Sequence, residues 1–247
     1  MASSLRILVV EDDRVNLLVI TRMLRRLGYD ADVAHNGIEA VEAASGTAFD
    51  IIFMDVMMPE LDGLGATVRI RERGDCGNPR IIAVTANAMA EDRTAALEAG
   101  MDEYVTKPIR LDVIRDVLER FSETAQQPEE AGKAEVAMLD TAVLDNLREM
   151  MGDESYFREL VAEFVENTET LVNDMAEGLS SEDWGSVQRA AHSLRSTSAT
   201  FGGMRLADCS HAAEETAKQG AGDRMPSLLT DLRRERNRLC SRLLSGC

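Results

Sequence analysis

The sequence predicts an α/β domain followed by an all-α domain. Residues 5–121 alternate five short apolar strands with five amphipathic segments of helix length. This alternation favours a doubly wound parallel sheet with helices on both faces. From residue 139 onward, long amphipathic patterns separated by short glycine breaks indicate an antiparallel helix bundle. Residues 122–138 are polar, acidic and without hydrophobic period, so we expect a flexible linker between domains at 1–121 and 139–247.

The elements can be placed along the chain from the hydrophobic pattern. Strands are expected at 5–10, 30–34, 51–54, 80–84 and 103–105, and helices of the first domain at 14–27, 36–45, 64–73, 89–98 and 110–121. The first, third and fourth strands are almost continuous in Ile, Val and Leu, as strands buried on both faces should be. The bundle helices are expected at 140–150, 153–178, 181–201, 203–219 and 223–245.

Composition excludes several classes of function. The net charge is −17 over 247 residues, and no basic segment is long enough to neutralise a nucleic-acid backbone. A basic run near the end is interpreted as the solvated face of a helix; it comprises Arg233, Arg234, Arg236 and Arg238. No apolar run approaches the roughly 20 residues that span a bilayer, and no signal peptide is visible. The four cysteines lack metal-binding spacing, so we expect free thiols in a cytoplasmic protein.

Acidic residues follow two strands of the predicted sheet. Glu11 and Asp12 come after the first strand and Asp55 after the third. The carboxyl ends of parallel strands share one edge of a sheet, where ligands bind. Carboxylates gathered there repel one another unless a cation is bound, and Mg²⁺ prefers oxygen ligands. The sequence therefore predicts a magnesium site, with Asp12 and Asp55 as direct ligands, Glu11 acting through water, and the Met57 carbonyl adding one oxygen.

The same edge carries groups suited to phosphoryl transfer. Asp55 is expected to be the nucleophile that forms an acyl phosphate by in-line attack. Lys107, after the fifth strand, would neutralise one phosphoryl oxygen, and the hydroxyl of Thr85, after the fourth strand, would donate to another. Pro108 follows the lysine and is a candidate cis proline.

A lone histidine lies on a predicted bundle helix. His192 falls in a stripe with Gln188 and Arg195, one residue over from the apolar stripe of segment 181–201, so we expect it to face solvent. An imidazole nitrogen can accept a phosphoryl group near neutral pH. Gln188 could hydrogen-bond the other ring nitrogen, and Arg195 could stabilise the phosphoryl charge. His35 and His211 are interpreted as ordinary surface histidines.

The first domain resembles a receiver domain of two-component signalling, of the kind attached to hybrid histidine kinases. The resemblance rests on the segments EDDRVN, MPELDG and TANAMAEDRTAALEAGMDEYVTKPI. It implies a flavodoxin-like fold, Asp55 as the phosphoacceptor, and Glu11 with Asp12 as the acidic pair that holds Mg²⁺. It also implies Thr85 as the switch hydroxyl, Lys107 as the pocket lysine and Tyr104 as the switch aromatic.

The second domain resembles a histidine-containing phosphotransfer (HPt) domain. The segments that carry this resemblance are AHSLRSTSATFGG, LADCSHAAEE and the upstream GDESYFRELVAEFVENTETLVNDM. It implies a four-helix bundle with His192 as a phosphoacceptor. Arg195 and Ser196 stand where lysine and glycine are usual. Arginine keeps the charge, whereas serine adds bulk where a partner receiver must approach.

Both resemblances predict a bacterial phosphorelay protein without an ATP site, which is not a kinase on its own but catalyses its own phosphotransfer. Asp55 would accept a phosphoryl group from a phosphohistidine on a sensor histidine kinase. His192 would exchange it with a receiver aspartate, in the same chain or in another receiver. Two alternatives remain open: a docking module switched by phosphorylation, with the HPt domain as a phosphate sink, or the C-terminal part of a hybrid sensor histidine kinase.

Overall fold

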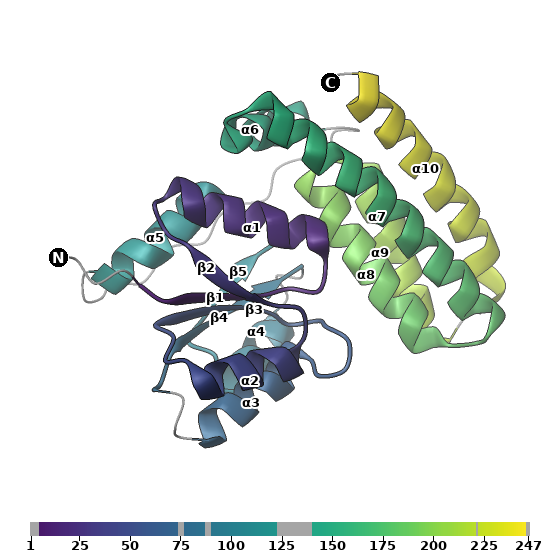
Figure 1. Ribbon diagram of the computed structural model, residues 1–247. Coiled ribbons are helices and arrows are strands. Elements are labelled where there is room, and N and C mark those ends of the chain that lie inside the picture. The colour runs from purple at the N-terminus through teal and green to yellow at the C-terminus, as the bar shows by residue number, and fades with distance from the viewer. Residues whose placement is uncertain (1–4, 74–76, 87–89, 123–139, 221, 246–247) are drawn as a thin grey trace.

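A computed structural model describes residues 5–73, 77–86, 90–122, 140–220 and 222–245. Figure 1 shows an N-terminal α/β domain lying beside a C-terminal helical domain. The predicted linker at 122–138 falls outside the described residues, except that Ser122 is the last residue of a helix and not the first of the linker.

The N-terminal domain is built on five parallel strands. They are β1 (Ile7–Val10), β2 (Ala31–Ala34), β3 (Ile51–Asp55), β4 (Arg80–Thr85) and β5 (Glu103–Thr106), in the order β2-β1-β3-β4-β5. Every residue of β1 and β3 is buried, and so is every residue of β4 except the first. The continuous apolar runs are therefore explained by helices on both faces of the sheet, and the predicted fold class is confirmed.

Helices cover the two faces of this sheet. They are α1 (Arg14–Arg26), α2 (Gly37–Gly46), α3 (Gly63–Arg73), α4 (Ala90–Glu98) and α5 (Leu111–Ser122). Ile7 and Val9 of β1 pack toward α1 and α5, whereas Leu8 and Val10 pack toward α2 and α3, because successive strand residues point to opposite faces. The helix α1 begins where it does because the Asp13 carboxylate accepts a hydrogen bond from the Asn16 backbone N–H at 2.9 Å.

The C-terminal domain contains only helices in its described part. They are α6 (Thr141–Met151), α7 (Glu154–Ser180), α8 (Trp184–Thr200), α9 (Met204–Lys218), a 3₁₀ turn at Gly222–Arg224 and α10 (Met225–Ser245). Asp140, Asp153 and Asp183 cap α6, α7 and α8 with their carboxylates. Among all described helices, none combines the length and apolar character that crossing a bilayer requires.

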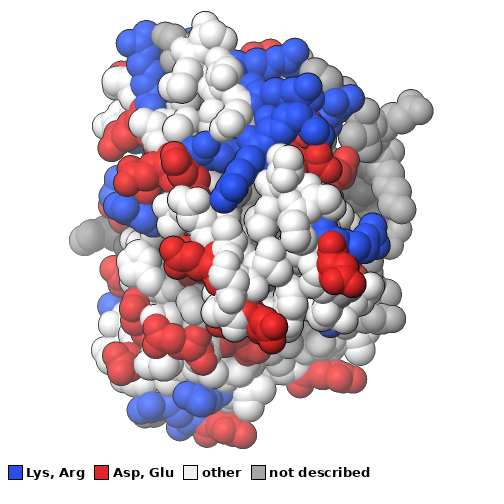
Figure 2. Space-filling model, turned by 90° about the vertical axis from the view of Figure 1, so that its right-hand side faces the viewer, with Lys and Arg blue, Asp and Glu red and all other residues white. Residues whose placement is uncertain are grey.

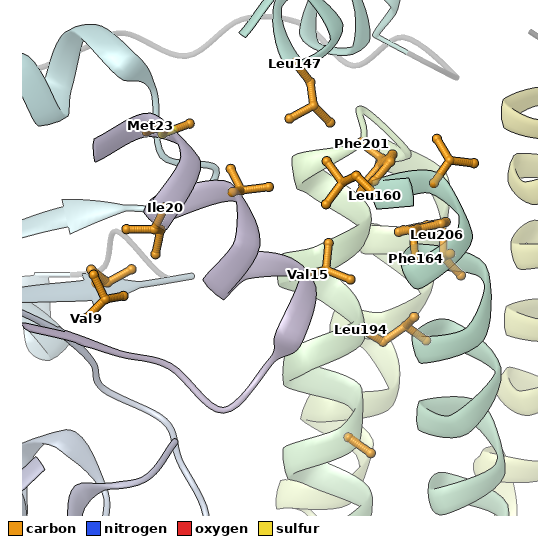
Figure 3. Close-up of a cluster of buried hydrophobic side chains, with 14 of the residues drawn as sticks. Val9, Val15, Ile20, Met23, Leu147, Leu160, Phe164, Leu194, Phe201 and Leu206 are labelled. Carbon is orange, nitrogen blue, oxygen red and sulfur yellow. The ribbon is translucent and has the colours of Figure 1, made fainter. Parts of the chain in front are cut away.

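One apolar core runs through both domains. The helix α1 contacts the sheet on one side and α7 and α8 on the other (Figure 1). Figure 3 shows Val15 of α1 projecting toward the bundle, where the rings of Phe164 and Phe201 pack at a tilt of 37° with centroids 4.2 Å apart. Val15 is completely buried. The two domains therefore dock on each other through a continuous set of buried side chains.

Basic side chains gather on the face of the molecule that carries α10 (Figure 2). A surface groove in this region is lined by arginines: Arg205, Arg234, Arg238 and Arg242. The prediction of a fully solvated basic face is wrong for Arg236, whose side chain is only 12% exposed. Its guanidinium reaches back to α7 and donates to the Val165 carbonyl at 2.7 Å.

Gly63 permits a close approach that fixes the end of β3. A Cβ atom at Gly63 would lie 2.1 Å from the backbone oxygen of Asp55. We expect Gly63→Ala to lower the free energy of unfolding by about 2 kcal/mol or more, since neither backbone can move without disturbing β3. Gly46→Ala, at a helical glycine with nothing within 4 Å of the added atom, is the matched control and should match or exceed wild type. Urea unfolding measures both, and equal stability of the two variants would contradict this account.

Candidate functional site

The structure brings the predicted acidic residues and the predicted lysine together at the carboxyl edge of the sheet. Each of Glu11, Asp12 and Asp55 contributes a carboxylate oxygen, and these oxygens lie within 4.8 Å of one another. The Lys107 ammonium lies 2.6 Å from Asp55 Oδ2 and 2.7 Å from Glu11 Oε2. The side chains of Lys107, Asp55 and Glu11 are at most 4% exposed. These four residues form what we call the acidic pocket.

The acidic pocket is short of positive charge. Burial, reinforced by Asp55, raises the pKa of Asp12 to about 7 and the pKa of Glu11 well above its usual value. Burial would lower the pKa of Lys107, but Asp55 and Glu11 outweigh it and keep the ammonium charged. One ammonium cannot balance three carboxylates, and the donors are all oxygens. The residues present therefore fit Mg²⁺.

The remaining pocket residues predicted from the sequence lie along the same edge. Thr85 is buried at the end of β4, and its carbonyl accepts from the Lys107 N–H at 2.7 Å. The Met57 N–H donates to Asp55 Oδ1 at 3.1 Å, and the Lys107–Pro108 bond is cis. The role of the Met57 carbonyl as a metal ligand stays a prediction.

Tyr104 lies half-buried on β5, with the Arg93 guanidinium 4.9 Å from its ring centroid. A half-buried ring on a strand is compatible with the switch role that the resemblance implies and equally with ordinary packing. That role stays a prediction.

The prediction that His192 faces solvent is wrong, because the residue is only 5% exposed. Arg195, Ser196 and Thr200, which follow it on the same side of α8, all contact the N-terminal domain. The helical pattern placed His192 correctly outside the apolar stripe of the bundle. That face is covered by the other domain, which a periodicity within one helix does not reveal.

A carboxylate from α9 orients the histidine ring. Glu214 Oε1 lies 3.2 Å from His192 Nδ1, and Glu214 Oε2 accepts from Arg195 Nη1 at 2.9 Å. Burial would raise the pKa of Glu214, but the hydrogen bond with His192 and the charges of its basic neighbours lower it to about 2. The predicted hydrogen bond from Gln188 to the ring is not formed, since Glu214 holds Nδ1. Among the described residues, none hydrogen-bonds the buried Nε2 atom.

Glu214 was not among the residues predicted from the sequence. It precedes Glu215, and such a pair is typical of a solvated helix face. A signal was nevertheless present, because Ala213 and Ala217 flank it at helical spacing and are buried. His211 was interpreted as an ordinary surface residue, but its Nδ1 accepts from Arg195 Nη1 at 3.0 Å.

The arrangement around His192 determines which nitrogen can react. A carboxylate partner favours the tautomer in which Nδ1 carries the hydrogen. Nε2 then holds the free lone pair, and it is the atom without a hydrogen-bonding partner in the described part of the chain. Nε2 is therefore the ring nitrogen with an available lone pair.

Each of the two domains matches a known protein family. Residues 7–119 match the family described as response regulator receiver domain, and residues 159–242 match the Hpt domain family. Histidine kinase 5 of Arabidopsis thaliana is 34% identical over 142 residues, covering 47% of this chain and 15% of that protein. The sensor histidine kinase RcsC of Escherichia coli K12 is 40% identical over 121 residues, covering 49% of this chain and 12% of RcsC. The chain thus matches a small part of these relatives.

Two solved structures resemble the N-terminal domain. The receiver domain of sensor histidine kinase PA1611 from Pseudomonas aeruginosa, described with a magnesium ion in its active-site cleft, is 42% identical. The match covers 48% of this chain and 98% of that one, with a TM-score of 0.46. A complex of the Saccharomyces cerevisiae phosphotransfer protein Ypd1 with the Ssk1 receiver domain matches at 28% identity and a TM-score of 0.45, covering 48% of this chain and 88% of that one. From the family matches, this chain belongs to the two-component signalling proteins and joins a response regulator receiver domain to an Hpt domain.

Proposed function

We propose that the chain relays a phosphoryl group through Asp55 and His192. The observation that carries the proposal is that one chain holds two candidate phosphoacceptor groups, each with neighbours suited to its own phosphoryl chemistry. The Asp55 carboxylate lies against the Lys107 ammonium at 2.6 Å. His192 Nε2 is left free while Glu214 holds the other nitrogen. One site suits an acyl phosphate and the other a phosphohistidine.

In the first step, Asp55 accepts the group from a phosphohistidine of a sensor histidine kinase. A carboxylate oxygen forms the new P–O bond while the P–N bond of the donor breaks, and the donor imidazole leaves with that electron pair. Lys107 neutralises a phosphoryl oxygen, and the Thr85 hydroxyl donates to another. Mg²⁺, held by Asp12 and Asp55 with Glu11 acting through water and the Met57 carbonyl adding an oxygen, supplies further charge neutralisation when bound.

In the second step, His192 Nε2 forms a P–N bond and the Asp55 carboxylate leaves with the electrons of the P–O bond. The hydrogen on Nδ1 stays in place, and Glu214 offsets the positive charge that the phosphorylated ring gains. Arg195, already bonded to Glu214, lies one turn from the ring and positions that carboxylate. The chemistry is reversible, so the partners set the direction of flow.

The wider setting is part of the same proposal. A sensor kinase is the donor, and receiver domains are the acceptors or donors at His192. Cys209 and Cys240 are free thiols, which fits the cytoplasmic location predicted from the sequence.

The two acceptors can be tested separately with a small acyl phosphate and Mg²⁺. We expect wild type to acquire both a base-labile label at Asp55 and an acid-labile label at His192. Asp55→Asn should lose both, because His192 is supplied through Asp55. His192→Gln should keep only the label at Asp55. Mass spectrometry of the labelled peptides locates the phosphoryl groups, and normal labelling of Asp55→Asn would remove this residue from the proposal.

Magnesium binding depends on the acidic pocket. We expect Asp12→Asn to weaken Mg²⁺ binding at least about tenfold, because a direct carboxylate ligand is lost. Asp30→Asn, at a side chain that is 94% exposed, is the control and should bind as wild type does. Calorimetric titration with MgCl₂ measures both affinities. Unchanged binding by Asp12→Asn would show that the metal lies elsewhere.

Glu214 should make the free energy of unfolding depend on pH at acidic pH values. A carboxyl with a pKa of about 2 in the folded chain and about 4.5 in the unfolded chain stabilises the fold above pH 4.5, and this contribution disappears as the pH falls toward 2. We expect Glu214→Gln to be less stable than wild type by about 2 kcal/mol at pH 7, with the difference shrinking below pH 4.5. Glu215→Gln, at a half-exposed neighbour, is the control. Urea unfolding across this pH range gives the differences, and a constant gap would refute the assignment.

A further inference from the structure

The docked domains meet through a polar network centred on Asp13. Its Oδ1 caps α1, whereas its Oδ2 accepts two hydrogen bonds from the Hpt domain. Asn167 of α7 donates at 2.7 Å and Thr197 of α8 donates at 2.9 Å. Asp13 is buried, so a carboxylate there needs these donors. The residue that starts α1 therefore also recognises two helices of the bundle.

A second contact links the interface to the acidic pocket. The Asn16 amide donates to Ser196 Oγ at 3.2 Å and lies 3.3 Å from Glu11 Oε1, while its oxygen accepts from Thr200 at 3.4 Å. Glu11 in turn bonds Lys107. Ser196, the residue that departs from the usual glycine, is thus a hydrogen-bonding partner of this chain's own receiver domain and not an obstruction.

The interface also reaches the end of β4. The Arg195 guanidinium donates through Nη2 to the Ala86 carbonyl, directly after Thr85. Through Nη1 it donates to Glu214, which bonds His192. The helix α8 therefore contacts two of the loops that form the carboxyl edge of the sheet, with His192 on the same side of the helix as these contacts.

Further contacts extend along α1. The Arg22 and Arg26 guanidinium groups donate to the Met151 and Glu149 carbonyls at the end of α6, at 3.3 and 2.6 Å. Arg22 also lies 4.0 Å from the ring centroid of Tyr156. With the buried Val15, these contacts run from one end of the helix to the other.

We propose that the receiver partner of His192 is Asp55 of the same chain, and that Asp13 and Asn16 select this Hpt domain by pairing with Asn167, Ser196 and Thr197. This inference rests on the proposed function and adds to it that the transfer takes place within one chain, together with the residues that select it. The transfer from Asp55 to His192 is then intramolecular, and its rate does not depend on protein concentration. One face of α1 is covered by α7 and α8 while the domains are docked.

The first experiment distinguishes transfer within a chain from transfer between chains. Full-length wild type and an equimolar mixture of Asp55→Asn with His192→Gln are labelled from a small acyl phosphate and Mg²⁺ at several micromolar concentrations. In wild type, His192 should acquire the label with a first-order rate constant that does not change with protein concentration. The mixture can label it only between chains, and should be slower by roughly a hundredfold or more, because a short linker gives an effective concentration on the order of millimolar. Equal rates that rise with concentration would overturn the proposal.

The second experiment tests the recognition residues without touching either acceptor. Asn167→Asp places a carboxylate beside Asp13 Oδ2, where the native amide donates at 2.7 Å, so the two groups repel. We expect at least a tenfold slower appearance of the label on His192, with labelling of Asp55 unchanged. Asn173→Asp, the same change at an exposed position of the same helix, should behave as wild type. Unchanged transfer in Asn167→Asp would refute the recognition role.

Failure of the relay and failure of the intramolecular transfer would give different labelling results. If wild type never carries a label on His192, the proposed relay is wrong. If the label appears with second-order kinetics, the relay stands and the intramolecular partner is wrong. Circular dichroism and normal labelling of Asp55 show whether Asn167→Asp is folded.

Discussion

The acidic pocket of the receiver domain depends on the balance between its carboxylates and the positive charge placed among them. Glu11, Asp12 and Asp55 share one edge of the sheet because five parallel strands end there, and such a group is tolerable only beside a cation. Lys107 supplies one positive charge from the turn after β5 and binds two of the three acids. The pocket is left with excess negative charge, which a divalent cation such as the proposed Mg²⁺ would balance.

In the Hpt domain, the ring proposed as the phosphoacceptor is held through one nitrogen, while the other has no partner among the described residues. Glu214 holds Nδ1 from a neighbouring helix, and Arg195 holds Glu214 while bonding the receiver domain through Ala86. The contacts that orient the histidine are therefore continuous with the contacts that dock the domains. Arg195 therefore contributes both to the docking of the two domains and to the orientation of the imidazole.

Local sequence patterns predicted the fold, because strands buried on both faces appear in the sequence as apolar runs. They also predicted most of the acidic pocket, because the carboxyl ends of parallel strands lie at one edge of the sheet. The predicted strands and helices agree with the structure to within a few residues at their ends. The predictions were wrong where the environment of a residue is set by another domain or another helix. His192 lies on a helix face whose later residues, Ser196 and Thr200, bond a helix more than a hundred residues away in the sequence, and its partner Glu214 lies on α9 beside a second glutamate. The helical period of α8 carries no information about either.

The arginine contacts on α6 have a consequence for the chain as a whole. The last turn of any helix leaves carbonyl groups without partners inside the helix. In α6 the Met151 carbonyl accepts from Arg22 of α1, and the Glu149 carbonyl accepts from Arg26 of α1 and from the Gly152 N–H. The helix α6 also lies outside the residues that match the Hpt family. Separation of the domains would remove both arginine contacts and loosen the end of α6. Amide hydrogens near Met151 would then exchange faster, giving a backbone signal of opening that requires no chemistry at either acceptor.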